Sequence, residues 1–353
     1  MRHGLNSSGR FRSGCGCVGI DVHCHVVPSS FPPVPGATPL SGWPSMTAVQ
    51  DCHATVVIDD RPYRTVSDAC WVAERRIAEM DRAGIAVQAL SPMPELFGYW
   101  IEAEAALHLV RHVNDVIAAL VQEGQGRFVG LGGLPMQDID LAIAELQRVM
   151  ALPGFCGVEI GSNINGTAIG DQRFHALFAE AERLGAAVFV HAVRPTGMDR
   201  LVGPAALQQV LAYPTDVGLA AASVITGGLL QRFPNLRIAF SHGGGTFAAL
   251  LPRLQQGYHA FPAVRDSLPE APLEQARKLY VDALVFDEDM LKRIVSVFGE
   301  DRVMLGTDYP FNFREMEPVA RIEQAFADPT LRERLTFANA LAFLGLDEET
   351  VSR

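Results

Sequence analysis

The 353-residue sequence has no apolar run approaching the roughly 20 residues that a bilayer-spanning helix needs. It is also short of positive charge, because 29 lysines and arginines face 40 aspartates and glutamates and the net charge is −11. A local pocket can still be cationic, but the overall charge disfavours binding to nucleic acid. These shortages predict a protein with neither a membrane nor a nucleic acid as its partner.

Cysteine is scarce as well. Six cysteines in a chain of this length do not make a disulfide scaffold, so we expect reduced thiols in a cytoplasmic protein. Cys15 and Cys17 are spaced for a small metal clip, but no second Cys or His pair stands near them, which favours a solvated tail. Residues 1–16 are rich in Gly, Ser and Arg and lack the apolar core of a secretory signal, so we expect a flexible leader there.

The sequence does have a regular alternation of strand-like and helix-like segments, which is typical of parallel α/β proteins. Eight such units predict one (β/α)8 TIM barrel over residues 17–353. A stretch from about 29 to 67, with a hairpin expected at 56–63, breaks the alternation and predicts an insertion after the first strand that covers the barrel mouth. The predicted strands are 18–23, 87–91, 128–132, 157–160, 187–191, 237–241, 279–282 and 303–307, and the predicted helices include 68–83, 102–122, 141–150, 174–184 and 287–298.

Four of these strands end in side chains that bind metals. His23 and His25 stand at the end of the first, His191 ends the fifth, His242 follows the sixth and Asp308 follows the eighth. Residues two apart in a strand point the same way, so the first two histidines can bind one ion together. Barrel enzymes place their chemistry at the carboxyl ends of their strands. Imidazoles and a carboxylate suit Zn²⁺ with one coordination position left open, so we predict a catalytic metal site.

A metal centre of this kind also needs a residue that moves protons near neutral pH. We assign that role to His242, because the glycines at 243–245 leave room for a substrate beside the backbone. Taken singly, each residue has a plainer interpretation: a surface HxH pair, a packed or capping histidine at 191, a turn or cap aspartate at 308. Their joint placement at four strand ends favours the metal site.

Six stretches resemble the aminocarboxymuconate semialdehyde decarboxylase family of the amidohydrolase superfamily, and the similarity runs from about residue 19 to about 346. The resemblance implies a distorted, metal-dependent-hydrolase type of barrel with one divalent metal, usually zinc. It implies that His23, His25, His191 and Asp308 are the ligands and His242 the acid/base. The stretches are QALSPMPELFGYW (88–100), RFVGLGGLPMQ (127–137), AERLGAAVFVH (181–191), HGGGTF (242–247), LGTDYPF (305–311) and NALAFLG (339–345).

The resemblance further implies a homodimer and two arginines that bind substrate carboxylates. Arg64 would come from the inserted segment, and Arg253 would reach across the interface into the neighbouring active site. The donor fork of arginine fits a carboxylate in two bonds, although a surface ion pair is the default for either residue alone. Where the family has Pro-Trp-Asp after the fifth-strand histidine, this chain has Ala192-Val193-Arg194. We therefore hypothesise that Arg194 faces the pocket and adds a carboxylate contact; the alternative is a solvent-exposed loop arginine.

Three functions remain open at this point. The leading prediction is a metal-dependent, non-oxidative decarboxylase, a carboxy-lyase acting on a small unsaturated or aromatic carboxylic acid. The second is a hydrolase or hydratase of the same superfamily that uses the water activated by the same metal. The third is a binding or structural protein with a degenerate site, against which the intact ligand set argues.

Overall fold

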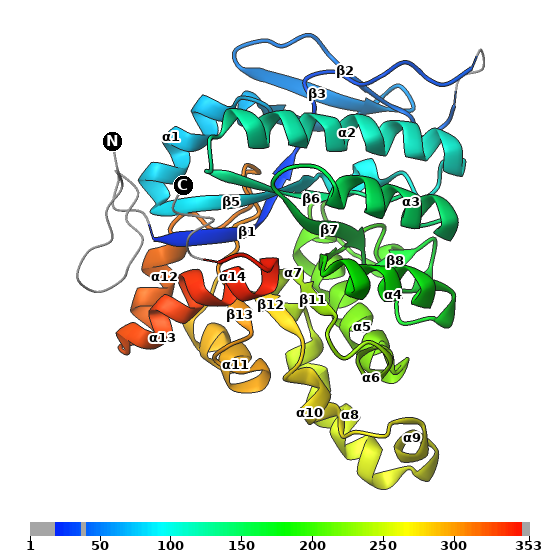
Figure 1. The fold of residues 1–353 in the computed structure, drawn as a ribbon, viewed down its shortest axis with the longest axis vertical. Coiled ribbons are helices and arrows are strands. Elements are labelled where there is room, and N and C mark those ends of the chain that lie inside the picture. The colour runs from blue at the N-terminus through cyan, green and yellow to red at the C-terminus, as the bar shows by residue number, and fades with distance from the viewer. Residues whose placement is uncertain (1–17, 37–39, 348–353) are drawn as a thin grey trace.

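The computed structural model describes residues 18–36 and 40–347. Its centre is a sheet of eight parallel strands in the order β1-β5-β6-β7-β10-β11-β12-β13 (Figure 1). The sheet closes on itself, because Val22 N donates to Leu305 O at 3.1 Å and His25 N donates to Tyr309 O at 2.6 Å. The predicted (β/α)8 barrel is therefore confirmed. The strands are β1 (Gly19–Val26), β5 (Ile85–Pro92), β6 (Phe128–Gly132), β7 (Phe155–Gly161), β10 (Ala187–His191), β11 (Arg237–Phe240), β12 (Tyr280–Asp282) and β13 (Val303–Met304).

All eight predicted strands are present, but five of them end one to three residues from the expected position, and three of these differences bear on the site. Strand β1 runs on to Val26, so His25 lies inside it. Strand β11 stops at Phe240, because the next residues form a short turn, α7 (Ser241–Gly244), in which His242 and Gly243 have left-handed backbone conformations. The last strand was predicted to reach 307 but stops at Met304. Beyond it the chain curls over the end of β1, where Thr307 N and Asp308 N both donate to His23 O.

The helices surround the barrel on its outside (Figure 1). Helices α1 and α4 end at Gly84 and Gly185, which have φ values of 74° and 64°. Glycine adopts this left-handed conformation at little cost, so both predicted stop signals act as expected. The helices next to the barrel are α1 (Ala73–Ala83), α2 (Ala103–Glu123), α3 (Ile139–Met150), α4 (His175–Leu184), α5 (Tyr213–Thr226), α6 (Leu229–Arg232), α10 (Pro272–Ala276), α11 (Glu288–Phe298), α12 (Pro318–Ala325), α13 (Pro329–Glu333) and α14 (Asn339–Leu344).

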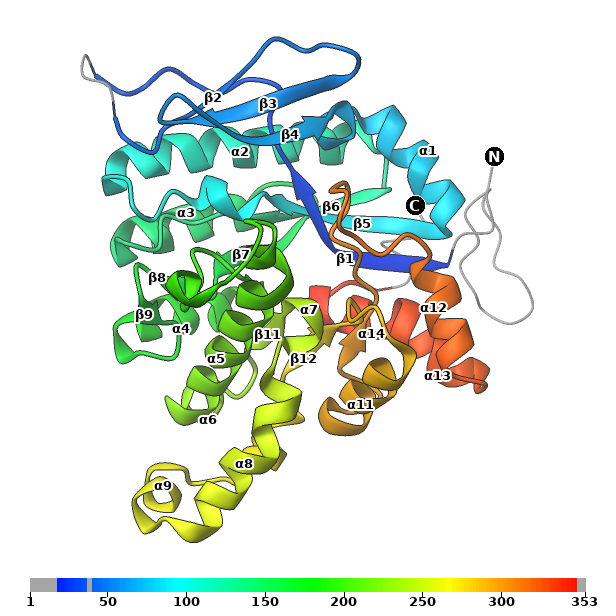
Figure 2. The same ribbon diagram turned by 180° about the vertical axis from the view of Figure 1, so that it is seen from behind.

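A small antiparallel sheet lies between β1 and α1 in the sequence, where the insertion was expected (Figure 2). Its strands are β2 (Pro44–Met46), β3 (His53–Ile58) and β4 (Arg61–Ser67). Ile58 pairs with Arg61 across a two-residue turn in which Asp59 and Asp60 both have positive φ. Such a turn matches the twist of a hairpin. The predicted leader over 1–16, with Cys15 and Cys17, lies outside the described residues, and the division into leader and single domain stays a prediction.

Helices α8 (Phe247–Ala260) and α9 (Pro262–Ser267) project away from the barrel as an arm in both views (Figures 1 and 2). The arm carries Arg253 on its surface and exposes 61% of Phe261. None of the helices in residues 18–36 and 40–347 is long and apolar enough to cross a bilayer.

A buried arginine connects helix α1 to the strand that carries two of the histidines. Arg76 is fully buried, and its guanidinium donates to Ala69 O, Gln88 Oε1 and His25 O. The carbon of the guanidinium also lies 4.9 Å from the ring centre of Tyr309. Since buried acceptors without a donor are costly, this side chain holds the end of β1 in place.

We expect the substitution Arg76→Met to lower the free energy of unfolding by about 3 kcal/mol, because it leaves three buried acceptors unpaired in similar volume. Chemical denaturation of the metal-free protein measures this loss. Arg82→Met is the matched control on the same helix, since 73% of that side chain is exposed and its nearest acid, Glu79, is 4.0 Å away. It should cost less than about 0.5 kcal/mol. Equal losses in the two variants would contradict the assigned role of Arg76.

Candidate metal centre

Strand β1 delivers two histidines to one point at the mouth of the barrel. Pairing between β1 and β5 slips between Asp21 and Cys24, so the backbone bulges at His23. Bulges next to active sites re-aim side chains. Both His23 and His25 are fully buried, and their ring centres lie 5.1 Å apart with the planes perpendicular.

Of the other two predicted ligands, one comes from β10, across the barrel from β1, and the other from the segment after β13, which lies beside β1 where the sheet closes. His191 ends β10, and Asp308 follows the curled segment after β13 with a φ of 67°, a conformation that non-glycine residues seldom adopt. One potential ligand atom from each of His23, His25, His191 and Asp308 lies within 4.8 Å of all the others. Asp308 Oδ1 is 3.0 Å from His25 Nε2 and 3.7 Å from His23 Nε2. These four residues, far apart in sequence, form a metal-binding site.

The hydrogen bonds around the three ligand histidines show that a divalent metal fits here. In each ring one nitrogen, Nδ1, is engaged by an oxygen, while Nε2 is buried with no hydrogen-bond partner. A metal-binding imidazole has this arrangement, because the outer bond fixes the tautomer and leaves the inner lone pair for the ion. The Nδ1 partners are Asp282 Oδ2 for His23 at 2.6 Å, Pro92 O for His25 at 3.1 Å and Ala192 O for His191 at 2.9 Å.

Asp282 is a functional residue that the analysis of the sequence missed. Besides His23 Nδ1, its carboxylate accepts the backbone N–H groups of His242 at 3.0 Å, Gly243 at 2.7 Å and Leu284 at 3.1 Å. Burial disfavours charge on both partners, but the close bond raises the pKa of His23 to about 9 and lowers that of Asp282. Its position could have revealed it, since it ends the predicted strand 279–282 as the ligands end theirs.

His242 lies beside the ligand cluster but outside it. Its ring centre is 5.0 Å from that of His191 and 5.2 Å from that of His23. Its backbone has a φ of 55°, held by the bond from its N–H to Asp282. Strained residues of this kind gather at functional sites. Burial and the neighbouring His23 lower the pKa of His242 to about 4, so its imidazole is neutral at neutral pH before a ligand enters.

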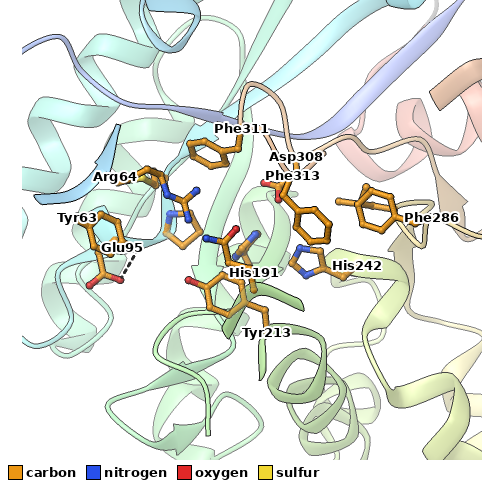
Figure 3. A pocket seen from close by; sticks show the side chains of 14 residues that line it. Tyr63, Arg64, Glu95, His191, Tyr213, His242, Phe286, Asp308, Phe311 and Phe313 are labelled. Carbon is orange, nitrogen blue, oxygen red and sulfur yellow. Dashed lines mark hydrogen bonds between the residues drawn. The ribbon is translucent and has the colours of Figure 1, made fainter. Parts of the chain in front are cut away.

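A pocket opens over the metal ligands and is lined by His191, His242 and Asp308 at its base (Figure 3). Its walls are largely aromatic, and a few polar side chains converge at its base, as in many sites that bind small molecules. The aromatic residues are Tyr63, Tyr213, Phe286, Phe311 and Phe313.

The three predicted substrate arginines have different places. Arg64, from β4, lines the pocket with its guanidinium carbon 4.3 Å from the ring centre of Phe311. Arg194 lies next to the pocket, where it stacks on Trp100 and approaches Glu95 at 3.5 Å, with half of its side chain exposed. Arg253 is exposed on the projecting arm and is not among the residues that line this pocket. Of these three arginines, only Arg64 lines the same pocket as the metal ligands within the described part of one chain.

Two further acids near the site, one buried and one partly buried, also escaped the analysis of the sequence. Glu159 of β7 is fully buried, with Oε1 4.0 Å from His25 Nδ1, and burial raises its pKa well above the ordinary value. Glu95 lines the pocket from the short 3-10 helix Pro94–Phe97. A lone acid in an apolar strand, as in 157–160, is a usable signal, whereas nothing in the sequence near residue 95 indicates a pocket.

Comparison with known proteins agrees with this geometry. The profile of the amidohydrolase family matches residues 20–346. The chain is 40% identical over 331 residues to 2-amino-3-carboxymuconate-6-semialdehyde decarboxylase of Dictyostelium discoideum, covering 93% of this chain and 92% of the relative. The corresponding enzyme of Caenorhabditis elegans is 28% identical, with 93% and 94% covered.

Solved structures extend the similarity. The 5-carboxyvanillate decarboxylase of Sphingomonas paucimobilis superimposes with a TM-score of 0.70 at 28% identity, covering 78% of this chain and 84% of that one. A dihydroxybenzoic acid decarboxylase from a Polaromonas species, with bound manganese, has the same TM-score at 22% identity, covering 79% and 88%. These relatives confirm the prediction of a carboxy-lyase and support a hydrolase less. The chain belongs to the amidohydrolase family and, within that superfamily, to the family of aminocarboxymuconate semialdehyde decarboxylase.

Proposed function

We propose that this protein removes carbon dioxide, without oxidation, from a small unsaturated or aromatic carboxylic acid bound between the metal centre and Arg64. The observation that carries the proposal is one pocket holding three buried imidazole nitrogens without partners, the carboxylate of Asp308 and the guanidinium of Arg64. Nitrogen and carboxylate donors suit a divalent cation, and the guanidinium suits the carboxylate of a substrate.

Zinc is the metal we propose for the four ligands, because three imidazoles and one carboxylate form its usual borderline donor set with a further position open. The manganese in the Polaromonas relative makes manganese the alternative. When bound, the cation would stabilise negative charge that develops on a substrate oxygen.

Arg64 is proposed to hold the substrate. No ion pair of its guanidinium is found among residues 18–36 and 40–347, so its donors remain available for a carboxylate. The ring of Phe311 beneath it fixes the plane of the fork and keeps water away, and both effects favour one orientation of the bound acid. The aromatic walls suit a flat, conjugated molecule.

His242 is proposed to supply the proton that replaces the departing carboxylate. The bond between the carboxylate carbon and the rest of the substrate breaks, carbon dioxide leaves, and the electron pair stays on the substrate carbon. That carbon takes a proton from the imidazolium form of His242, which then regains one from water in the pocket. Because burial lowers its pKa to about 4, this imidazole is a strong proton donor once charged.

We further propose a homodimer in which Arg253 completes the pocket of the neighbouring subunit. Arg253 lies exposed on an arm that leaves its own barrel, and the same arm exposes the apolar side chains of Leu250 and Phe261. Apolar groups next to a cation are suited to an interface.

The cysteines bear on where the protein works. Cys24, Cys52, Cys70 and Cys156 are free thiols, which supports a reducing, cytoplasmic location.

The first test separates the proton donor from the ligands. His242→Ala should retain stoichiometric zinc and lose at least about 100-fold in the rate of carbon dioxide release, because only the proton step is removed. Asp308→Ala should lose metal as well, since one of the four donors is gone. Metal analysis and a carbon dioxide assay on aminocarboxymuconate semialdehyde and hydroxybenzoates give both readouts. The opposite pattern would show that the ligand and the proton donor have been exchanged.

The second test follows the proton on His23. Since the pKa of this residue is raised to about 9 while a ligand must be neutral, binding of zinc to the metal-free protein at pH 7.5 should release about one proton. The number should fall as the pH rises through 9, where His23 is already neutral. Calorimetry in buffers of different ionisation enthalpy measures it. Asp282→Asn, which removes the charge that raises this pKa, should abolish the release, and a wild-type value near zero at pH 7.5 would contradict the assignment.

The third test asks whether Arg253 acts in the partner subunit. The variants Arg253→Ala and His242→Ala should each be inactive alone. Mixed after dissociation and reassociation, they should recover about a quarter of the wild-type activity, because half of the dimers are hybrids and each hybrid has one intact site. Size measurement by light scattering serves as the control for dimer formation. No recovery among confirmed hybrid dimers would mean that Arg253 does not reach the neighbouring site.

A further inference from the structure

The pocket contains an acid that the proposed reaction does not use. Glu95 lines it together with Arg64, His191 and His242, and its side chain is only 12% exposed. The backbone holds the residue firmly, because Met93 N donates to Val26 O at 3.0 Å and the 3-10 helix begins at Pro94. A carboxylate fixed in a pocket for acids calls for an explanation, since it repels the anionic part of any substrate.

The hydrogen bonds of Glu95 are long. Tyr63 OH donates to Oε2 at 3.5 Å, and Arg194 Nη2 donates to Oε1 at 3.5 Å. Both distances exceed the usual range of about 2.7 to 3.2 Å. A carboxylate can accept about four hydrogen bonds, so this one keeps acceptor capacity inside the pocket. Burial raises the pKa of Glu95 above its ordinary value in spite of Arg194 and Tyr63, which means that the ionised form would gain from a further donor.

The position of Glu95 decides which part of a ligand can meet it. Figure 3 shows Glu95 beside Tyr63 on one side of the pocket and His242 on the other, with His191 between them. A substrate whose reacting carbon lies at His242 therefore presents its remote end to Glu95. The group that meets Glu95 directly must be uncharged or cationic, because a carboxylate in that contact would meet like charge, whereas Arg64 beside Tyr63 stays available for a carboxylate of the same substrate.

We propose that Glu95 is a specificity-determining residue that selects substrates with an O–H or N–H donor, a hydroxyl or amino group, at the end remote from His242. The substrate class is then a hydroxy- or amino-substituted unsaturated or aromatic acid. The inference rests on the proposed function for the placement of the reacting end. Arg194 acts on Glu95 from outside, as its counter-ion stacked on Trp100.

The test uses matched ligands on the zinc-loaded protein. Benzoic acids with a hydroxyl or amino group at each ring position are paired with the acid that has a methyl group in the same place. We expect the wild type to bind the donor-bearing member of the best pair about 10- to 100-fold more tightly, the range of one charge-assisted hydrogen bond. Glu95→Leu should bring that ratio close to one, whereas Glu95→Gln, which keeps a carbonyl acceptor, should retain part of it.

Arg194→Ala is the control that separates a direct contact from an indirect one. It should change the affinity for both members of a pair by a similar factor and preserve their ratio. If Arg194→Ala removes the ratio as completely as Glu95→Leu does, or if no wild-type pair differs by more than about threefold, the proposal is overturned. Zinc content and thermal unfolding confirm that the variants are folded.

The binding measurement tests the role of Glu95 and the turnover measurement tests the proposed decarboxylation, so each proposal can fail without the other. Calorimetry gives the ratio even for acids that release no carbon dioxide, so a donor preference without any turnover in the panel would count against the proposed decarboxylation and support the role of Glu95. Turnover with equal kcat/KM for both members of every pair would leave the decarboxylation intact and refute the role of Glu95.

Discussion

The bond between Asp282 and His23 is the interaction on which the site depends. This fully buried carboxylate fixes the tautomer of a metal ligand and, through two backbone N–H groups, holds the strained turn at His242 and Gly243. A buried carboxylate is costly unless its acceptors are satisfied, and here four donors surround it. One residue thereby couples the geometry of the metal centre to the position of the proposed proton donor, which explains how two functions can share so small a volume.

Strain is concentrated around this bond. His242 and Asp308 both have left-handed backbone conformations, and both contribute to the base of the pocket. Such conformations persist only where surrounding bonds enforce them. Here the His242 backbone N–H donates to the Asp282 carboxylate, and the N–H groups of Thr307 and Asp308 both donate to His23 O. The stability of the barrel offsets the free-energy cost of these two conformations. The mouth of the barrel is built from less regular segments, namely the inserted sheet with Arg64 and the 3-10 helix with Glu95. The residues proposed for catalysis thus follow strands of the barrel, whereas the residues proposed to select the substrate belong to the inserted sheet and the 3-10 helix.

The family relationship and the local chemistry agree on the reaction type and differ in how much they say about the substrate. Decarboxylases that act on several different acids have the same barrel, as the relatives illustrate. We propose that this chain sets its own preference at Glu95, which lines the pocket with Arg194 and Trp100 behind it, because this acid would meet the end of the substrate that takes no part in bond breaking.

The sequence by itself determined the barrel and the ligand set, because both depend on local patterns. These patterns are the alternation of strands and helices and the placement of histidines at strand ends. The glycine stops at Gly84 and Gly185 are local signals of the same kind. Arg64 was predicted only from the resemblance to the family, and its contact with a substrate stays a prediction. Only the tertiary structure decided that Asp282 serves His23, that the last strand stops at Met304, and that Glu95 lines the pocket. The physical reason is that these contacts join residues tens to hundreds of positions apart, and closure of the barrel alone determines which of them meet.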